Sequence, residues 1–182
     1  MGWLSVRATA DEAASALPGD ELVPADVTMD RAFTLDAAPS IVWPWLVQIG
    51  KGRAGWYLPR GVERFVPRDR RAARRFDPQF ASLEVGQTIA DWGGRDATLT
   101  VMTISPPEVL VYASRRGRTE FSWALALTDL GDARTRVHSR VRIGPVRRRR
   151  LAEYGGGLFD AATISGLAHG LRERLAEAGD PS

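Results

Sequence analysis

The feature that most constrains this chain is a run of five short strand-like segments followed by one long amphipathic helix. Alternating apolar and polar residues, separated by turn residues, recur at short intervals after Val85. The expected strands are 87–92, 98–104, 109–114, 119–128 and 134–143. Connections this short favour antiparallel neighbours, so the pattern predicts an antiparallel sheet.

The last two strands can be placed in register. With residues 129–133 as a five-residue hairpin loop, one face becomes almost wholly apolar and the other small or charged. The apolar face then pairs Phe121 with Val141, Trp123 with Ser139, Leu125 with Val137 and Leu127 with Thr135. The other face pairs Glu120 with Arg142, which predicts a cross-strand ion pair, and turns His138 toward solvent among arginines.

A long helix is predicted at the C-terminal end of the chain. Three glycines at 155–157 precede it, and apolar residues then recur at helical spacing over residues 158–178. Ile164, Leu167 and Leu171 mark the inner side, and Arg174 falls on the opposite, charged side. Small residues along the inner half, among them Gly166 and Gly170, predict unfilled volume beside the helix.

The first part of the chain predicts an arm, a strand and a helix. Thr9 and Glu12 have capping-box spacing and open a short helix that ends near Leu17. Residues 26–36 alternate as a strand, with Arg31 on its apolar side. We expect Arg31 at the solvent-exposed end of the strand. The alternative is that its charge is placed inside a cavity. A helix over 39–49 follows, and the expected division is an arm at 1–24 and one domain at 25–182.

Two further segments of the sequence, at 50–55 and 60–83, do not indicate a cofactor site. Residues 50–55 spell GxGxxG, but they follow a helix and precede a poor helix start, so we interpret them as a loop and expect no dinucleotide cofactor. Residues 60–83 predict a short helix and an irregular excursion. The chain has no cysteine and two histidines, which argues against thiolate zinc sites and multi-histidine metal sites, so no metal is expected.

Basic charge is concentrated in two places. The formal net charge is +3, but residues 60–75 carry +5 and residues 134–150 carry +8. The predicted register places the turn at 115–118 beside Arg147–Arg150, so both lie at one end of the sheet. These arginines predict at most weak contact with anionic surfaces and no specific nucleic-acid site, since no aromatic stacking platform lies between them. The alternative is a solvated surface in an arginine-rich chain.

No targeting segment or membrane-spanning run is visible, and we expect a cytoplasmic protein.

The order of elements, together with local sequence, resembles the helix-grip fold of the START-related superfamily known as SRPBCC. That superfamily includes polyketide cyclases, lipid-transfer domains and the major birch-pollen allergen. The similar segments are LPGDELVP at 17–24, VWPWLVQIG at 42–50, GWY at 55–57, VGQT at 85–88 and SW at 122–123. The resemblance covers roughly 18–179 and matches an uncharacterised bacterial branch.

The resemblance implies an α+β helix-grip fold, in which a curved antiparallel sheet wraps around the C-terminal helix and encloses an apolar cavity. It implies a small hydrophobic molecule as the ligand, with rings, one polar group and two helix leucines as the cavity wall. The residues expected to line it are Trp43, Trp56, Tyr57, Phe121, Trp123, Ser139, Leu167 and Leu171.

The alternative function is a cyclase, aromatase or dehydratase that uses the same cavity. Its catalytic residues are unknown, because no nucleophile, base and orienting group can be assigned from the sequence. The polar candidates are Arg31, Asp91, Tyr112 and Ser139. The sequence gives no oligomeric state.

Overall fold

The computed structural model describes residues 6–147 and 149–179, and it contains one six-stranded sheet. The strand order is β1-β6-β5-β4-β3-β2, and all neighbours are antiparallel. The strands are β1 (Val27–Leu35), β2 (Thr88–Ala90), β3 (Thr98–Ser105), β4 (Val109–Arg116), β5 (Thr119–Gly131) and β6 (Arg134–Gly144). The predicted strands are confirmed, and the first strand joins the sheet at its far edge, beside the last.

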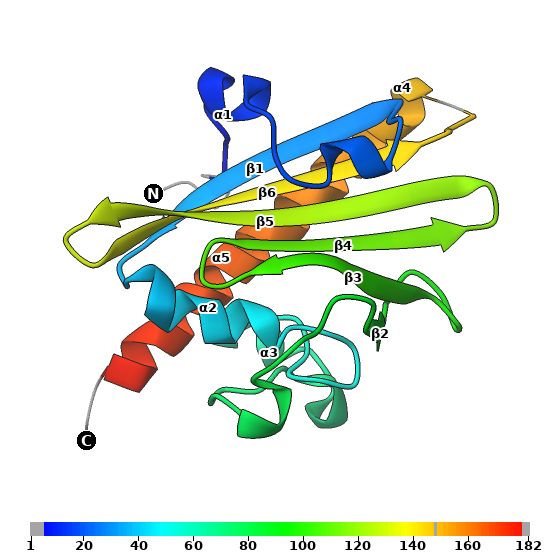
Figure 1. The fold of residues 1–182 in the computed structure, drawn as a ribbon. Helices are drawn as coiled ribbons and strands as arrows, with labels where there is room; N and C mark the ends of the chain where they lie inside the picture. Colours follow the sequence, from blue (N-terminus) through cyan, green and yellow to red (C-terminus); the bar gives the residue numbers. More distant parts are fainter. Residues whose placement is uncertain (1–5, 148, 180–182) are drawn as a thin grey trace.

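The long helix α5 (Gly157–Gly179) crosses one face of the sheet (Figure 1). It continues from α4 (Arg149–Leu151) through a π-helical turn at Ala152–Gly156. Helix α2 (Pro39–Val47) and the short α3 (Arg60–Glu63) lie near the C-terminal half of α5 (Figure 1). The core lies between the inner face of the sheet and α5. It includes Phe33, Trp123, Leu125, Val137, Ile164, Leu167 and Leu171.

The hairpin register differs from the sequence-based prediction by two residues. Trp123 lies opposite Val141, and Leu125 lies opposite Ser139. The loop is shorter than expected because Asp132 and Ala133, with φ of 50° and 52°, form a tight two-residue turn after an irregularity between Asp129 and Gly131. A shift of two residues leaves every side chain on its predicted face, so the separation of the faces is confirmed.

The prediction of an ion pair between Glu120 and Arg142 is wrong because of this shift in register. In the observed register Glu120 lies opposite Gly144 on one side and Arg115 on the other, and it forms its ion pair with Arg115. The β4–β5 turn nevertheless lies at the end of the sheet where β6 stops. The Thr119 hydroxyl donates to the carbonyl of Pro145 at 3.2 Å, which joins the two segments.

A loop fills the space that the small residues of α5 leave. A Cβ atom on Gly170 would lie 2.7 Å from the backbone of Leu58, and one on Gly166 would lie 2.8 Å from the Leu58 side chain. The prediction that these glycines leave unfilled volume is therefore wrong. They allow the chain at 57–58 to pack directly on the helix.

Arg174 also lies on an unexpected side of α5. Its side chain is fully buried, and its guanidinium donates to Glu63 at 2.6 Å and to the carbonyl of Ala73 at 2.7 Å. The sequence pattern placed it on the exposed side, because the excursion at 60–83 that covers it has no clear periodicity. Residues 50–55 form a loop, as predicted, with a bridge between Gly50 and Gly55. Among the described residues, no helix is both long and apolar enough to cross a membrane.

Candidate functional site

A row of four aromatic rings runs from the surface into the core beside α5. Trp92 is 49% exposed and meets Trp56 edge to face, with 5.9 Å between ring centroids. Trp56 contacts Trp123 at 5.7 Å, and Trp123 stacks on Tyr112 at 5.6 Å. Exposure decreases along the row, because Trp123 and Tyr112 are buried. The row therefore connects solvent to the apolar interior.

Three separate elements position Tyr112, Trp123 and Trp56, and Trp92 follows β2. The β4–β5 register places Tyr112 directly opposite Trp123, on the face that packs toward α5. Trp56 comes from the loop after residues 50–55, and its indole N–H donates to the carbonyl of Thr163 on α5 at 3.3 Å. Trp56 therefore bridges the sheet and the helix.

A polar strip lies beside the row on the same inner face. The Trp123 indole N–H donates to the Ser139 hydroxyl at 3.0 Å, and Ser139 lies opposite Arg31 on β1. The Nε of Arg31 lies 3.0 Å from a carboxylate oxygen of Asp160, on the first turn of α5. The expectation that Arg31 lies at a solvent-exposed end of the strand is therefore wrong. Its charge is turned inward and paired.

The carboxyl group of Asp160 is unusual in this strip. Burial raises the pKa of Asp160 to about 6, and the opposing effect of Arg31 does not cancel that increase. A carboxyl group with a pKa near neutrality can both accept and donate a proton under physiological conditions. Among the described residues, this strip supplies the group best suited to acid–base chemistry on the inner face.

Besides Arg31 Nε and Asp160 Oδ2 of the ion pair, two buried polar atoms near the row have no hydrogen-bond partner among the described residues. They are the hydroxyl of Tyr112 and the Nε of Arg53. Burial raises the pKa of Tyr112 and lowers the pKa of Arg53, and each of the two groups weakly opposes the shift of the other. An unsatisfied buried hydroxyl costs roughly 1–3 kcal/mol, so a polar atom of a ligand placed there would be stabilised.

Six of the eight residues predicted to line a cavity form two groups. Trp56, Trp123 and Ser139 are joined by contacts, and Phe121 lies on the same inner face of β5. Leu167 and Leu171 are buried on α5, as expected for the helix wall.

Trp43 and Tyr57 belong to neither contact set. The Tyr57 hydroxyl donates to the carbonyl of Trp45 at 2.9 Å, and the Arg174 guanidinium lies 4.5 Å from its ring centre. Trp43 is buried in α2, within the core. A binding role for any of the eight residues stays a prediction.

Comparison with known proteins shows the fold. No family model and no curated protein matches the chain. Among solved structures, a protein from Mesorhizobium loti is 19% identical, with a TM-score of 0.51, over 85% of this chain and 99% of the other. A protein from Rhodobacter sphaeroides is 16% identical, with a TM-score of 0.54, over 86% and 97%. An HSP90 activator from Plasmodium falciparum is 10% identical, with a TM-score of 0.53, over 82% and 96%.

This chain has the helix-grip fold. The curved antiparallel sheet and long C-terminal helix are those expected from the resemblance to the START-related superfamily. Identities this low show the architecture alone, so the chemistry of this helix-grip protein has to be argued from its own residues.

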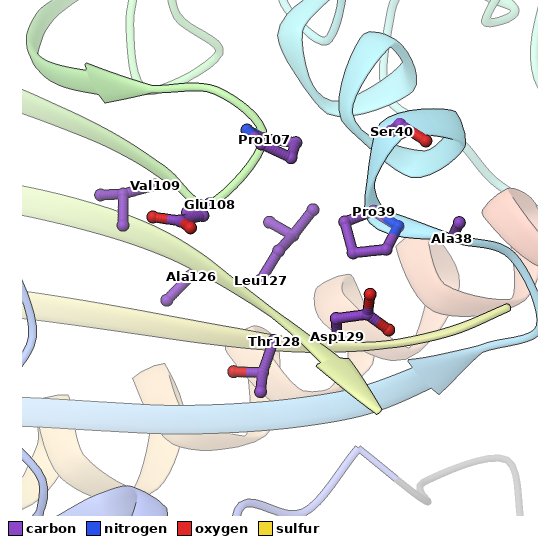
Figure 2. A pocket seen from close by; sticks show the side chains of 10 residues that line it. All are labelled: Ala38, Pro39, Ser40, Pro107, Glu108, Val109, Ala126, Leu127, Thr128 and Asp129. Atoms are coloured by element: carbon purple, nitrogen blue, oxygen red, sulfur yellow. The ribbon is translucent and has the colours of Figure 1, made fainter. Parts of the chain in front are cut away.

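Two surface hollows of the helix-grip domain lie away from the aromatic row. One, of about 590 Å³, lies between the start of α2, the β3–β4 turn and β5 (Figure 2). It is lined by Ala38, Pro39, Ser40, Pro107, Glu108, Val109, Ala126, Leu127, Thr128 and Asp129. The other, of about 700 Å³, is lined by Trp45, Arg60, Arg74, Arg75, Phe76, Glu177 and Ala178.

Neither hollow includes any of the eight predicted residues. In the first hollow the charged lining groups are the carboxylates of Glu108 and Asp129. In the second hollow, Arg74 already forms ion pairs with the carboxylates of Glu63, Glu173 and Glu177. Among the described residues, no group of three or more histidine or carboxylate side chains could hold a metal ion.

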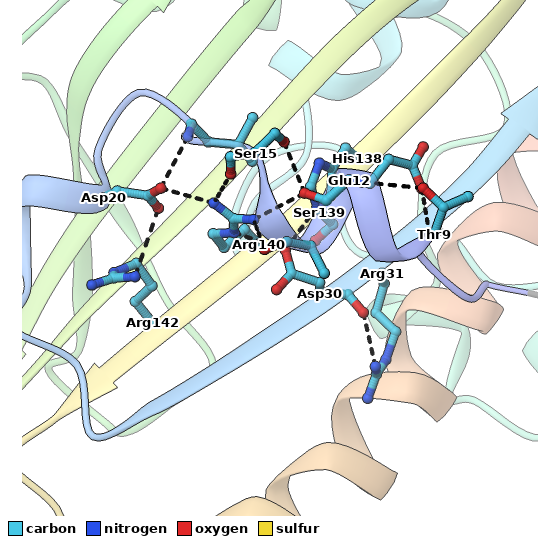
Figure 3. A network of polar contacts seen from close by, with 12 residues as sticks. Thr9, Glu12, Ser15, Asp20, Asp30, Arg31, His138, Ser139, Arg140 and Arg142 are labelled. Carbon is cyan, nitrogen blue, oxygen red and sulfur yellow. Dashed lines mark hydrogen bonds and ion pairs between the residues drawn. The ribbon is translucent and has the colours of Figure 1, made fainter.

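The outer face of the sheet carries a dense ion-pair network (Figure 3). Arg140 on β6 donates to Asp30 at 2.7 Å and to Asp20 at 2.8 Å, and also to three backbone carbonyls at 12–15. His138 lies 2.7 Å from the same Asp30 oxygen. The N-terminal segment, residues 6–26, covers these groups, so the expectation that His138 faces solvent is wrong. The network fastens that segment to the sheet.

The helix in that segment is the one predicted from the capping box. It is α1 (Ala10–Ala14), shorter than expected, and the Thr9–Glu12 capping box is present. Glu12 also accepts two hydrogen bonds from Arg136, and these lower its pKa to about 2. The predicted division of the chain at residues 24 and 25 stays a prediction, and residues 1–5 lie outside the described part.

Sequence reasoning missed Asp160 and Trp92. A signal for Asp160 existed, because it precedes Ile164 by four residues and so shares the inner side of the helix. Trp92 was expected at the end of the strand at 87–92, but β2 ends at Ala90 and Trp92 lies in the turn after it. Tyr112 and Arg31 were weighed as polar candidates, but the pairing of Arg31 depends on the contact between β1 and α5 that only the fold supplies.

Proposed function

We propose that the protein binds a small hydrophobic molecule on the inner face of the sheet, between Trp123 and α5. The supporting observation is the aromatic row, which leads from exposed Trp92 to buried Tyr112, whose hydroxyl has no partner among the described residues. Flat rings provide a large contact area for an apolar ligand, and Ser139 and Tyr112 would orient its polar atoms.

Entry requires the Trp56 loop to move. Trp56 is held to α5 by one hydrogen bond of 3.3 Å and to Trp123 by ring contact. Swinging Trp56 outward would leave the face of Trp123 free for a ligand ring, and the ligand would replace the contact that is lost. The similar solved structures include an activator of HSP90, so the fold alone does not favour one function, and the proposal depends on the row itself.

Native mass spectrometry of freshly purified protein, followed by organic extraction, tests the proposal. We expect one apolar molecule per chain, released on denaturation. Trp123→Ala and Trp56→Leu should raise the dissociation constant of that molecule about tenfold, which corresponds to about 1.4 kcal/mol of binding free energy. Trp45→Ala is the matched control, because Trp45 is a buried tryptophan that contacts Tyr57 and lies outside the row.

Two results would count against the proposal. If folded Trp123→Ala carried as much ligand as the wild type, Trp123 would be a core residue and the binding face would lie elsewhere. Trp56→Leu covers the case in which Trp123→Ala does not fold, because Trp56 is only partly buried. An empty spectrum would argue against a carrier and would favour the second candidate.

The second candidate is a cyclase-like or dehydratase-like enzyme acting on a poly-β-ketone. The observation that favours it is the Arg31–Asp160 pair on the inner face, with the pKa of Asp160 near 6. The ionised carboxylate would remove a proton from a carbon between two carbonyls, and the guanidinium of Arg31 would stabilise the enolate. The enolate carbon would then attack another carbonyl of the same chain, and Asp160 would return the proton to the new alkoxide.

A synthetic poly-β-ketone thioester is the probe for this candidate. We expect the rate to rise with pH through about 6 as Asp160 ionises, and Asp160→Asn to lower kcat about a hundredfold without loss of substrate binding. Unchanged turnover by Asp160→Asn would exclude Asp160 as the base.

A further inference from the structure

The start of the C-terminal helix exposes three large apolar side chains together. Tyr154 is 80% exposed, Leu158 is 68% exposed and Phe159 is 73% exposed. Tyr154 and Leu158 are four residues apart in a helical segment, and Phe159 follows directly. Scattered exposed apolar residues are ordinary, but a cluster of large ones marks a contact surface. We refer to these three residues as the apolar tip.

The apolar tip is held in place by the sheet. Arg31 donates to the carbonyl of Gly157 at 2.7 Å and pairs with Asp160, so the residues on both sides of Leu158 and Phe159 are anchored to β1. The Thr163 hydroxyl donates to the carbonyl of Phe159 at 2.7 Å. Leu158 and Phe159 are therefore exposed on an anchored turn of α5.

Arginines precede the apolar tip in the sequence. Over residues 147–159 the sequence has four arginines and one carboxylate, Glu153. Arg147, Arg149 and Arg150 are exposed, and Arg149 pairs with Glu153. Arg147 and Arg150 form no ion pair with a described residue. Arg148 lies outside the described residues.

A second basic segment lies at the same end of the sheet. Helix α4 follows the end of β6, and the β4–β5 turn lies at that end of the sheet too (Figure 1). Arg118 in this turn is exposed, and Arg115, near the end of β4, is exposed but paired with Glu120. The combined surface is thus cationic around an apolar centre.

We propose that this surface docks the protein on an anionic lipid bilayer, with the apolar tip inserted between headgroups and the arginines on the phosphates. Helical segments that carry aromatic and leucine side chains beside arginines bind at this interface, where apolar burial and charge attraction act together. The long stems of the arginines allow their guanidinium groups to remain at the headgroup level.

Two other occupants fit the surface less well. A nucleic acid would use the arginines and could stack on Tyr154 and Phe159, but it gains little from Leu158. A second copy of the chain, related by a two-fold axis through the apolar tip, would bring two arginine clusters of the same sign together. A bilayer satisfies both the apolar centre and the cationic margin. This inference does not depend on whether the inner face binds a ligand.

Co-sedimentation with vesicles tests the proposal. The vesicles are phosphatidylcholine alone, or phosphatidylcholine with phosphatidylserine, at low and at physiological salt. We expect binding to the anionic vesicles, weakening with salt. The triple variant Tyr154→Ser, Leu158→Ser, Phe159→Ser should bind about a hundredfold more weakly. The triple variant Arg147→Gln, Arg149→Gln, Arg150→Gln should lose a similar factor on anionic vesicles.

Matched controls come from another exposed part of the chain. Phe65 is 76% exposed, and Arg68 and Arg70 are exposed, but they lie in the excursion after α3. Phe65→Ser and the pair Arg68→Gln, Arg70→Gln should bind as the wild type does. If these controls lose binding equally, the contact is non-specific and the proposal is wrong.

A labelled cysteine reports the orientation directly. Because the chain has no cysteine, Phe159→Cys and Phe65→Cys each provide one attachment point for a polarity-sensitive dye. We expect a blue shift on anionic vesicles for the dye at 159 and none for the dye at 65. A wild-type protein that binds no vesicle at low salt, or no shift at 159, would overturn the proposal. So would self-association that the serine variant abolishes while vesicles remain unbound, which would assign the surface to a second copy.

Discussion

The guanidinium of Arg31 on β1 lies 3.0 Å from the carboxylate of Asp160 on α5, and this pair joins the edge of the sheet to the first turn of the long helix. The same guanidinium donates to the carbonyl of Gly157, one turn earlier. Ser139, the hydrogen-bond acceptor of Trp123, lies opposite Arg31. The pair therefore connects the candidate site on the inner face with the helix start that carries the apolar tip.

Asp160 should make stability depend on pH in a defined direction. Its pKa in the folded state, about 6, is above the ordinary value of 3.8, so the folded state retains a proton that the unfolded state releases. The contribution is fully present below pH about 4 and is lost as pH rises through about 6. The loss is on the order of 2–3 kcal/mol.

Urea unfolding between pH 4 and 8 measures this effect. The unfolding free energy of the wild type, measured relative to that of Asp160→Asn, should fall as pH rises from 4 to 8. The reason is that Asp160 ionises in this range and asparagine does not. Asp132→Asn, in the exposed β5–β6 turn, is the control and should follow the wild type. Parallel profiles for the wild type and Asp160→Asn would contradict the assignment.

Arg140 should be the most sensitive position of the outer face. Its side chain is 4% exposed and contacts Asp30, Asp20 and the N-terminal segment. Arg140→Met leaves the buried carboxylate of Asp30 without that cation, and we expect a loss of roughly 3–5 kcal/mol in unfolding free energy. The double variant Arg140→Met, Asp30→Asn should recover part of the loss. Arg142→Met is the matched control, because Arg142 is more exposed and should cost far less.

Glu12 should control how firmly the N-terminal segment is held. Its hydrogen bonds with Arg136 and its capping-box bond lower its pKa to about 2, below the ordinary value of 4.5. The stability it contributes is therefore present above pH about 4.5 and is lost as pH falls toward 2. Glu12→Gln should speed backbone hydrogen exchange in residues 6–26 at neutral pH. Asp11→Asn is the control, and equal exchange in both variants would contradict the role of Glu12.

The strands and their faces could be predicted because they depend on local alternation, which the two-residue register error leaves unchanged. The register itself could not, because Asp132 and Ala133 adopt positive φ without a glycine at either position. His138 and Arg140 alternate as exposed residues do, and only the distant N-terminal segment makes them buried. The inner site was predicted in part for the same reason: Trp123 and Ser139 follow from periodicity, whereas the Arg31–Asp160 pair joins residues far apart in the sequence.

Arg174 gives a further prediction about what holds the Trp56 loop in place. Its guanidinium donates to Leu58, Ala73 and Glu63 from the C-terminal half of α5, so one buried cation fastens the chain at 58–73 to the helix. Arg174→Met would leave Glu63 buried without that partner, and we expect a loss of roughly 3–5 kcal/mol in unfolding free energy. Arg174→Lys should also be destabilising, because an ammonium group lacks the planar fork of donors that reaches all three acceptors.

The double variant Arg174→Met, Glu63→Gln separates two explanations of that loss. If the loss comes from the buried Glu63 carboxylate, which Arg174→Met leaves with only Arg74 as an ion-pair partner among the described residues, the double variant should be more stable than Arg174→Met alone. If the lost bonds to Leu58 and Ala73 cause it, the second substitution should bring no recovery, and the segment at 58–73 should exchange its backbone hydrogens faster in both variants. Arg172→Met, two residues away and bonded to the carbonyl of Thr34 on β1, is the matched control and should leave exchange at 58–73 unchanged.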